Sequence, residues 1–165
     1  MRLIQLASVT IHLLAAASWF GAMVFIVAAL VPAMRGRELA ERRQILSAAA
    51  RRLRALVWPL FALLIATGVL QLWLRGYRWP DVAGAMWQGA PGHALALKLT
   101  LFGAALVLAA LHDFAIGPRA AAAPEGSRAR ERGRRLAGLL GRISMLLAVG
   151  ILAAAVAFVR GGFSP

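Results

Sequence analysis

The sequence has no cysteine, a single lysine, a single tyrosine and only six acidic residues in a chain of 165. The lack of cysteine excludes disulfides, thiolate metal sites and iron–sulfur clusters. Six acidic residues against nineteen basic ones leave a formal net charge of +13. A charge of this size is typical of proteins that bind an anionic surface, so the sequence has to be examined for whether that surface is nucleic acid or anionic lipid.

Apolar residues are what the sequence has in abundance. They make up 61% of the chain, and the mean hydropathy is +0.74. Several uncharged runs approach the about 20 residues that span a bilayer, which indicates an integral membrane protein. We expect one all-α domain over 1–165, an antiparallel four-helix bundle because the connections are short. The predicted membrane helices are 3–33, 56–74, 93–116 and 138–159.

The arginines lie in two blocks between these apolar runs, one in 35–54 and one in 119–135. By the positive-inside rule both blocks face the cytoplasm and both termini face away from it. This arrangement predicts a multi-pass protein of the cell's inner (cytoplasmic) membrane. It also favours membrane lipids over nucleic acid as the partner of the basic residues, so we expect no nucleic acid to bind.

Prolines and glycines predict where the helices begin and end. Pro32 marks the exit of the first helix, and Pro59 is expected in the first turn of the second, where its missing N–H costs least. Gly117 and Pro118 are expected to end the third helix. Because a proline precedes an arginine block in each half of the chain, a duplicated helical hairpin is one interpretation.

Four residues within the apolar runs stand out as candidate ligands. Taking about 1.5 Å of rise per residue, His12 and Lys98 lie roughly 9 and 12 Å outward of the helix centres. Met23 and His112 lie roughly 8 and 9 Å inward by the same arithmetic. Since ionisable residues inside a membrane often serve a site, we predict an outer pair, His12 with Lys98, and an inner pair, Met23 with His112. Either pair suits a prosthetic group such as haem, which needs nitrogen or sulfur donors in an apolar pocket.

Structural roles also fit these residues. His12 can hydrogen-bond Ser8, Thr10 or a backbone carbonyl, and Lys98 can extend its long side chain to the interface. Met23 is typical of core packing.

At the inner end of the third helix, His112 and Asp113 favour a solvated pair. Copper has few donors here, because Cu(I) prefers thiolates and thioethers and the five methionines form no pair at helical spacing. A copper site built from His12 and His93 would join residues whose depths differ by roughly 10 Å.

Three stretches carry a family resemblance: IHLLAAASWFGAMVF at 11–25, RRLRALVWPLFALLIATGVLQLW at 51–73 and LALKLTLFGAALVLAALHDFAIGPR at 95–119. They resemble the CopD copper-resistance family of small membrane proteins, and more distantly the HemJ family of protoporphyrinogen oxidases. Both resemblances imply a four-helix membrane bundle. The CopD branch implies copper uptake or tolerance, and the HemJ branch implies b-type haem.

The HemJ resemblance also implies site residues. Its members have a histidine before the tryptophan of the first helix, matched by His12 and Trp19, and a lysine in the third helix, matched by Lys98. These are the haem-associated positions, so His12 and Lys98 are the implied ligands of the haem iron. His112 matches a histidine found late in the third helix. The chain differs from that pattern in 24–29, where tyrosine, proline and arginine usually stand. If the chain is an enzyme, the resemblance implies an oxidoreductase of the protoporphyrinogen-oxidase type.

Three hypotheses of different classes follow. The first is a haem-b protein with a redox or haem-handling role. The second is a protein of copper transport or tolerance, with copper in place of haem. The third is a non-catalytic subunit that packs against a larger membrane complex or another copy of itself, using small-residue faces such as 15–17 and 104–110.

Overall fold

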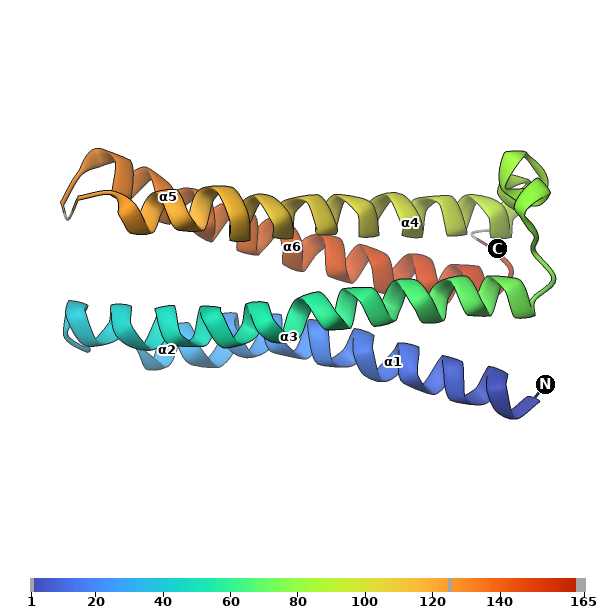
Figure 1. Ribbon diagram of the computed structural model, residues 1–165, viewed down its shortest axis with the longest axis horizontal. Helices are drawn as coiled ribbons and strands as arrows, with labels where there is room; N and C mark the ends of the chain where they lie inside the picture. Colours follow the sequence, from blue (N-terminus) through green and yellow to red (C-terminus); the bar gives the residue numbers. More distant parts are fainter. Residues whose placement is uncertain (1, 125, 163–165) are drawn as a thin grey trace. The chain divides into compact units, whose positions relative to one another are not determined.

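The computed structural model describes residues 2–124 and 126–162, and the ribbon is helical almost throughout (Figure 1). No strand occurs among these residues, which confirms the all-helical class. The chain divides into two compact units, Met1–Arg78 and Trp79–Pro165. Each unit is a helical hairpin whose long helices pack against each other in opposite directions.

The first unit consists of one interrupted helix, a short turn and a second, longer helix. The interrupted helix is made of α1 (Arg2–Phe25), the π-helical segment η1 (Ile26–Leu30) and α2 (Val31–Ala33). After the turn, α3 (Leu39–Leu74) runs back along α1. The polar residues of the first span are therefore brought against the C-terminal half of α3.

The second unit repeats this plan after two short 3₁₀ turns. Its elements are η2 (Trp79–Ala83), η3 (Ala85–Trp87), α4 (Gly89–Ala110), the π-helical η4 (Leu111–Ile116), α5 (Gly117–Ala122) and α6 (Arg128–Val159). Both α4 and α5 pack against α6.

Four helices in the described residues are long and apolar enough to cross a membrane: Arg2–Ala33, Leu39–Leu74, Gly89–Ala120 and Arg128–Val159. Large apolar side chains such as Leu3 and Val159 are exposed on these helices. A surface of this kind is unfavourable in water and matches the acyl chains of a bilayer. The prediction of a multi-pass membrane protein is confirmed.

Two helices begin well before the residues expected from hydropathy. The second starts at Leu39, not at 56, and the fourth starts at Arg128, not at 138. The fourth helix begins early because the Ser127 side chain accepts a hydrogen bond from the backbone N–H of Arg130 at 3.2 Å, which caps the first turn. Arginine, alanine and glutamate are good helix formers, so the arginine-rich stretches extend the membrane helices as polar turns. Pro59 consequently lies inside α3 and not in its first turn.

The third helix also continues past its predicted end. Gly117 and Pro118 do not stop it; Pro118 occupies the first turn of α5, where proline is tolerated. The π-helical segment directly before it supplies the physical reason. A proline ring clashes with the carbonyl four residues earlier, and a wider turn at that place relieves the clash.

The two units share these local features in the same order. In each, a π-helical segment ends two residues before a proline, at Leu30 before Pro32 and at Ile116 before Pro118. Each unit then ends its last helix with an arginine followed by a glycine of positive φ.

At the first of these ends, the N–H groups of Gly76 and Tyr77 donate to the carbonyls of Trp73 and Leu72, both at 3.1 Å. At the second, the N–H groups of Gly161 and Gly162 donate to the carbonyls of Phe158 and Ala157, at 3.4 and 2.8 Å. Both are Schellman motifs, in which glycine adopts the left-handed conformation without steric cost. The shared order of π-segment, proline and cap supports the interpretation of a duplicated hairpin.

The core of the first unit contains large aromatic side chains. Trp19 of α1 and Phe61 of α3 are both buried, and their rings meet edge to face with centroids 5.3 Å apart. Trp58 packs on the same phenylalanine at 5.8 Å. Edge-to-face pairs of this kind add to the stabilisation from burial, so they fix how α1 lies along α3.

The second unit is packed with small residues. Ala94 and Ala105 of α4 and Ala148 and Ala154 of α6 are almost fully buried. Small side chains let two helix backbones approach closely, which is the main source of helix association in a membrane. At Gly133 of α6 the approach is close, since a Cβ added there would lie 2.5 Å from the Cβ of Ala120.

We therefore expect Gly133→Ala to destabilise the second unit. The added methyl group would overlap with Ala120 and force α5 away from α6, at a cost of about 1–3 kcal/mol. Gly141→Ala on the same helix is the matched control, because nothing lies within 4 Å of its added Cβ. Its expected effect is neutral or a gain of up to about 1 kcal/mol from helix propensity. Thermal unfolding in detergent measures both, and equal midpoints for the two variants would contradict the close approach.

Candidate functional site

The polar site of the first unit is centred on His12, which α1 places half-buried against α3. Its Nδ1 lies 2.7 Å from Thr67 Oγ1. Thr67 is buried, and its hydroxyl lies 2.6 Å from the carbonyl oxygen of Leu63, one turn earlier in α3. The three groups form a chain of hydrogen bonds that we call the His12–Thr67 relay.

The hydrogen bonds of Thr67 favour a proton on Nδ1 of His12. The Thr67 hydroxyl has one hydrogen, and the Leu63 carbonyl can only accept. The hydroxyl therefore donates to Leu63, and the Thr67 oxygen accepts from His12 Nδ1–H. In the neutral imidazole, a proton on Nδ1 leaves the lone pair on Nε2. A ring held by Nδ1–H to an oxygen acceptor is the arrangement that orients metal-binding histidines in proteins.

Two further polar residues extend the relay toward the N-terminus of α1. The Ser8 hydroxyl donates to the carbonyl oxygen of Thr67 at 3.4 Å, and Gln71 Nε2 donates to the carbonyl of Ser8 at 3.5 Å. Ser8 and His12 are four residues apart on α1, and Thr67 and Gln71 are four apart on α3, so each pair lies on one helix face. We refer to these four residues as the polar cluster.

The imidazole ring lies beside Gly68 of α3. A Cβ added to Gly68 would lie 3.7 Å from His12 Cε1, which is ordinary van der Waals contact, so an alanine would fit at this position. Two turns further along α1, the buried Trp19 and Phe61 close the apolar side of the hairpin. The relay is thus held between a polar end, toward Ser8, and an aromatic end.

The partner of His12 differs from the ones expected from sequence. Ser8 and Thr10 on its own helix were the expected side-chain partners, but the hydrogen bond goes to Thr67, 55 residues away. Ser8 instead joins α3 through the Thr67 carbonyl, and Thr10 is exposed. The sequence does contain a signal for this contact, because polar residues stand four positions apart both in 8–12 and in 67–71. In an antiparallel hairpin the two polar pairs can face each other.

The other predicted ligands lie as follows. Met23 is half-buried in α1, and Lys98 is half-buried in α4. His112 lies in the π-helical segment η4, where its Nδ1 is 3.1 Å from Asp113 Oδ1. The two side chains are 41% and 16% exposed, and they lie within a helix that continues through η4 into α5. The predicted pairs of His12 with Lys98 and of Met23 with His112 each combine residues of different units, and they stay predictions.

Metal-binding side chains are sparse around the relay. No group of three or more His, Asp or Glu residues that could hold a metal ion occurs in 2–124 and 126–162, and the sequence has no cysteine. His12 is therefore not part of a group of that kind among the described residues.

Comparison with known families gives one match. The family described as Copper resistance protein D matches residues 47–158. This range is more than half of the chain, so the chain belongs to that family. The matched range includes Thr67 and begins after His12. No curated protein and no solved structure matches the chain. The family supports the copper-related expectation, and nothing in the match supports haem.

Removing the Thr67 hydroxyl is expected to weaken the first hairpin. Thr67→Val keeps the side-chain shape but leaves His12 Nδ1–H without its acceptor, and hydrogen bonds between membrane helices contribute about 1 kcal/mol. Thr67→Ser restores the hydroxyl and is expected to recover most of the loss, while Thr10→Val at an exposed position of α1 changes nothing. Unfolding free energies in mixed micelles provide the measurement. Equal stability of the valine and serine variants would refute the relay.

Proposed function

We propose that this member of the Copper resistance protein D family moves copper ions through a membrane and that His12 is a residue that contacts the ion on the way. What supports this is the His12–Thr67 relay, which presents the lone pair of an oriented imidazole within an apolar hairpin. Imidazole nitrogen is a good ligand for copper. The ion is the cargo in this proposal and not a resident cofactor.

The family name and the relay support each other through Thr67. The matched range 47–158 includes Thr67, whereas His12 lies outside it. Thr67 therefore belongs to the part of the chain that resembles copper-resistance proteins, and its side chain contacts His12 of another helix. This contact is the reason for assigning copper to the first unit.

The topology proposed with this function follows the charge of the turns. Arginine-rich turns connect the two helices of each unit, and the positive-inside rule places them on the cytoplasmic side of the inner membrane. The N-terminal end of α1, where Ser8 and Gln71 lie, would then face the opposite side. Copper would enter the polar cluster from that side and meet the aromatic end of the hairpin beyond His12.

Haem is the alternative that the resemblance to the HemJ family implies, with His12 and Lys98 as ligands of the iron. The observation in its favour is the same one, because a histidine with its lone pair on Nε2 is the usual axial ligand of haem iron. The two functions differ in a simple observable. A haem protein has an intense Soret absorption band when purified, and a protein that only passes copper has none.

Replacing His12 tests the proposal directly. Purified protein in liposomes is supplied with Cu⁺ outside and a membrane-impermeant coloured Cu⁺ chelator inside, so that transport appears as colour. We expect His12→Ala to lower the initial rate by about tenfold or more, because the metal-contacting nitrogen is gone. The control is His93→Ala, which removes an exposed histidine at the start of α4. Equal rates for His12→Ala and the wild type would refute the proposal, as would a Soret band lost only in His12→Ala.

A second measurement tests whether Thr67 positions His12. Loss of a hydrogen-bonded partner of a metal-binding histidine typically costs about 10- to 100-fold in affinity or activity. Thr67→Val is therefore expected to raise the copper concentration needed for half-maximal transport, and Thr67→Ser to restore it. If both variants fold and transport alike, Thr67 has no role beyond packing.

A further inference from the structure

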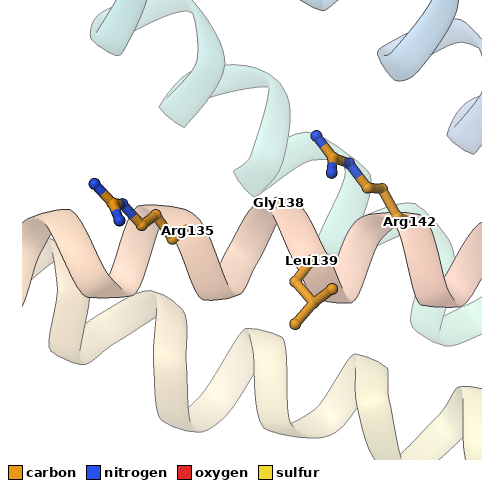
Figure 2. A pocket seen from close by; sticks show the side chains of 4 residues that line it. All are labelled: Arg135, Gly138, Leu139 and Arg142. Carbon is orange, nitrogen blue, oxygen red and sulfur yellow. The ribbon is translucent and has the colours of Figure 1, made fainter.

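We propose that Arg135, Gly138, Leu139 and Arg142 of α6 form a binding site for the phosphate headgroup of an anionic phospholipid. These four residues line one pocket of about 350 Å³. All four lie within two turns of the same helix, so the site depends only on the second unit. Figure 2 shows Arg135 and Arg142 leaving the same side of α6, with Gly138 between them and Leu139 pointing elsewhere.

The spacing of the two arginines suits an anion. Residues seven apart on a helix lie within about 20° of one another around the axis and about 10.5 Å apart along it. The position between them is Gly138, and nothing lies within 4 Å of where its Cβ would be. The floor of the pocket is therefore open backbone, with a guanidinium at each end. Arginine binds phosphate oxygens through two parallel N–H donors, which a lysine cannot do.

The charges around the pocket leave it strongly positive. Arg135 Nε lies 3.2 Å from Glu131 Oε1, with side chains 79% and 43% exposed. An ion pair this exposed contributes little energy and is easily exchanged for a phosphate. Arg142 is exposed as well. A phosphate that contacts both arginines would be held by two cationic groups, each contributing about 1 kcal/mol near a membrane surface.

The position of the pocket along α6 indicates a lipid and not a soluble phosphate. Arg142 is the last charged residue before the uncharged stretch 143–159, so the pocket lies at the boundary of the apolar part of the helix. Leu139 and Leu146 are 51% and 72% exposed and share one helix face, seven residues apart. A phospholipid can place its phosphate at the arginines and its acyl chain along Leu146, one turn beyond Arg142, whereas a free phosphate would gain only the first contact.

This site is independent of the copper proposal. It involves none of the residues of the polar cluster, which belong to the first unit. Basic residues are attracted to anionic membranes in general, and the proposal assigns a specific lipid contact to two of the arginines of α6. The remaining exposed arginines of the same helix provide matched controls.

The experiment compares lipid binding by purified, full-length variants in neutral detergent. Native mass spectrometry counts the bound lipids while phosphatidylglycerol or phosphatidylcholine is titrated in, and thermal unfolding gives a second readout. Arg135→Gln with Arg142→Gln is the test variant. Arg128→Gln with Arg132→Gln removes the same charge from exposed positions of α6 outside the pocket. Inorganic phosphate and glycerol phosphate are titrated separately to identify the source of the bound group.

We expect wild type and the Arg128/Arg132 control to bind phosphatidylglycerol in preference to phosphatidylcholine. The Arg135/Arg142 variant is expected to bind it about 30-fold more weakly, which corresponds to two lost arginine contacts. Inorganic phosphate at the same concentration is expected to neither stabilise the protein nor displace the lipid. Undiminished binding by the test variant would overturn the proposal. So would equal weakening by both double variants, or tight binding of inorganic phosphate with no preference for lipid.

Should the test variant fail to fold, as judged by helical circular dichroism, lysine replaces glutamine at both positions. Lysine keeps the charge and loses the paired donors, so binding is expected to fall several-fold while phosphatidylglycerol stays preferred. Binding equal to that of the wild type would show that charge alone holds the lipid, which contradicts the site as proposed.

Discussion

The absence of water inside a bilayer is the constraint on which this structure depends. Each polar group placed there has to find a partner within the protein, at a cost of several kcal/mol if it does not. Thr67 satisfies this condition twice with one hydroxyl, donating to the Leu63 carbonyl and accepting from His12. The two helices of the first hairpin are thereby joined in one register.

The same constraint explains how prolines are tolerated in the membrane helices. Pro32 and Pro118 each follow a π-helical segment, which absorbs the clash that a proline creates in a regular α-helix. The chain uses this solution twice, and it ends each hairpin with the same Arg–Gly cap. After each proline, the arginine-rich segment at the start of the next long helix, α3 or α6, is itself helical. This places guanidinium groups on a rigid helix, where Arg135 and Arg142 line one pocket.

The copper contact and the lipid site that we propose lie in different parts of the chain for chemical reasons. In the copper proposal, a transient contact with the ion uses a neutral nitrogen donor in apolar surroundings, which the first hairpin has in His12. A phosphate needs fixed positive charge at the boundary between apolar and polar solvent, which α6 has where its arginines meet the stretch 143–159. Small residues such as Ala94 and Ala148 pack the second hairpin closely.

The sequence by itself determined the class, the number of spans, the candidate residues His12, Lys98, Met23 and His112, and the resemblance to copper-resistance proteins. Hydropathy and charge suffice for these because they depend on composition along short stretches. Only the tertiary structure decided where the second and fourth membrane helices begin, since their arginine-rich first turns form helix without an apolar signal in the sequence. It also decided that His12 pairs with Thr67, because a contact across 55 residues exists only once two helices have packed in one register.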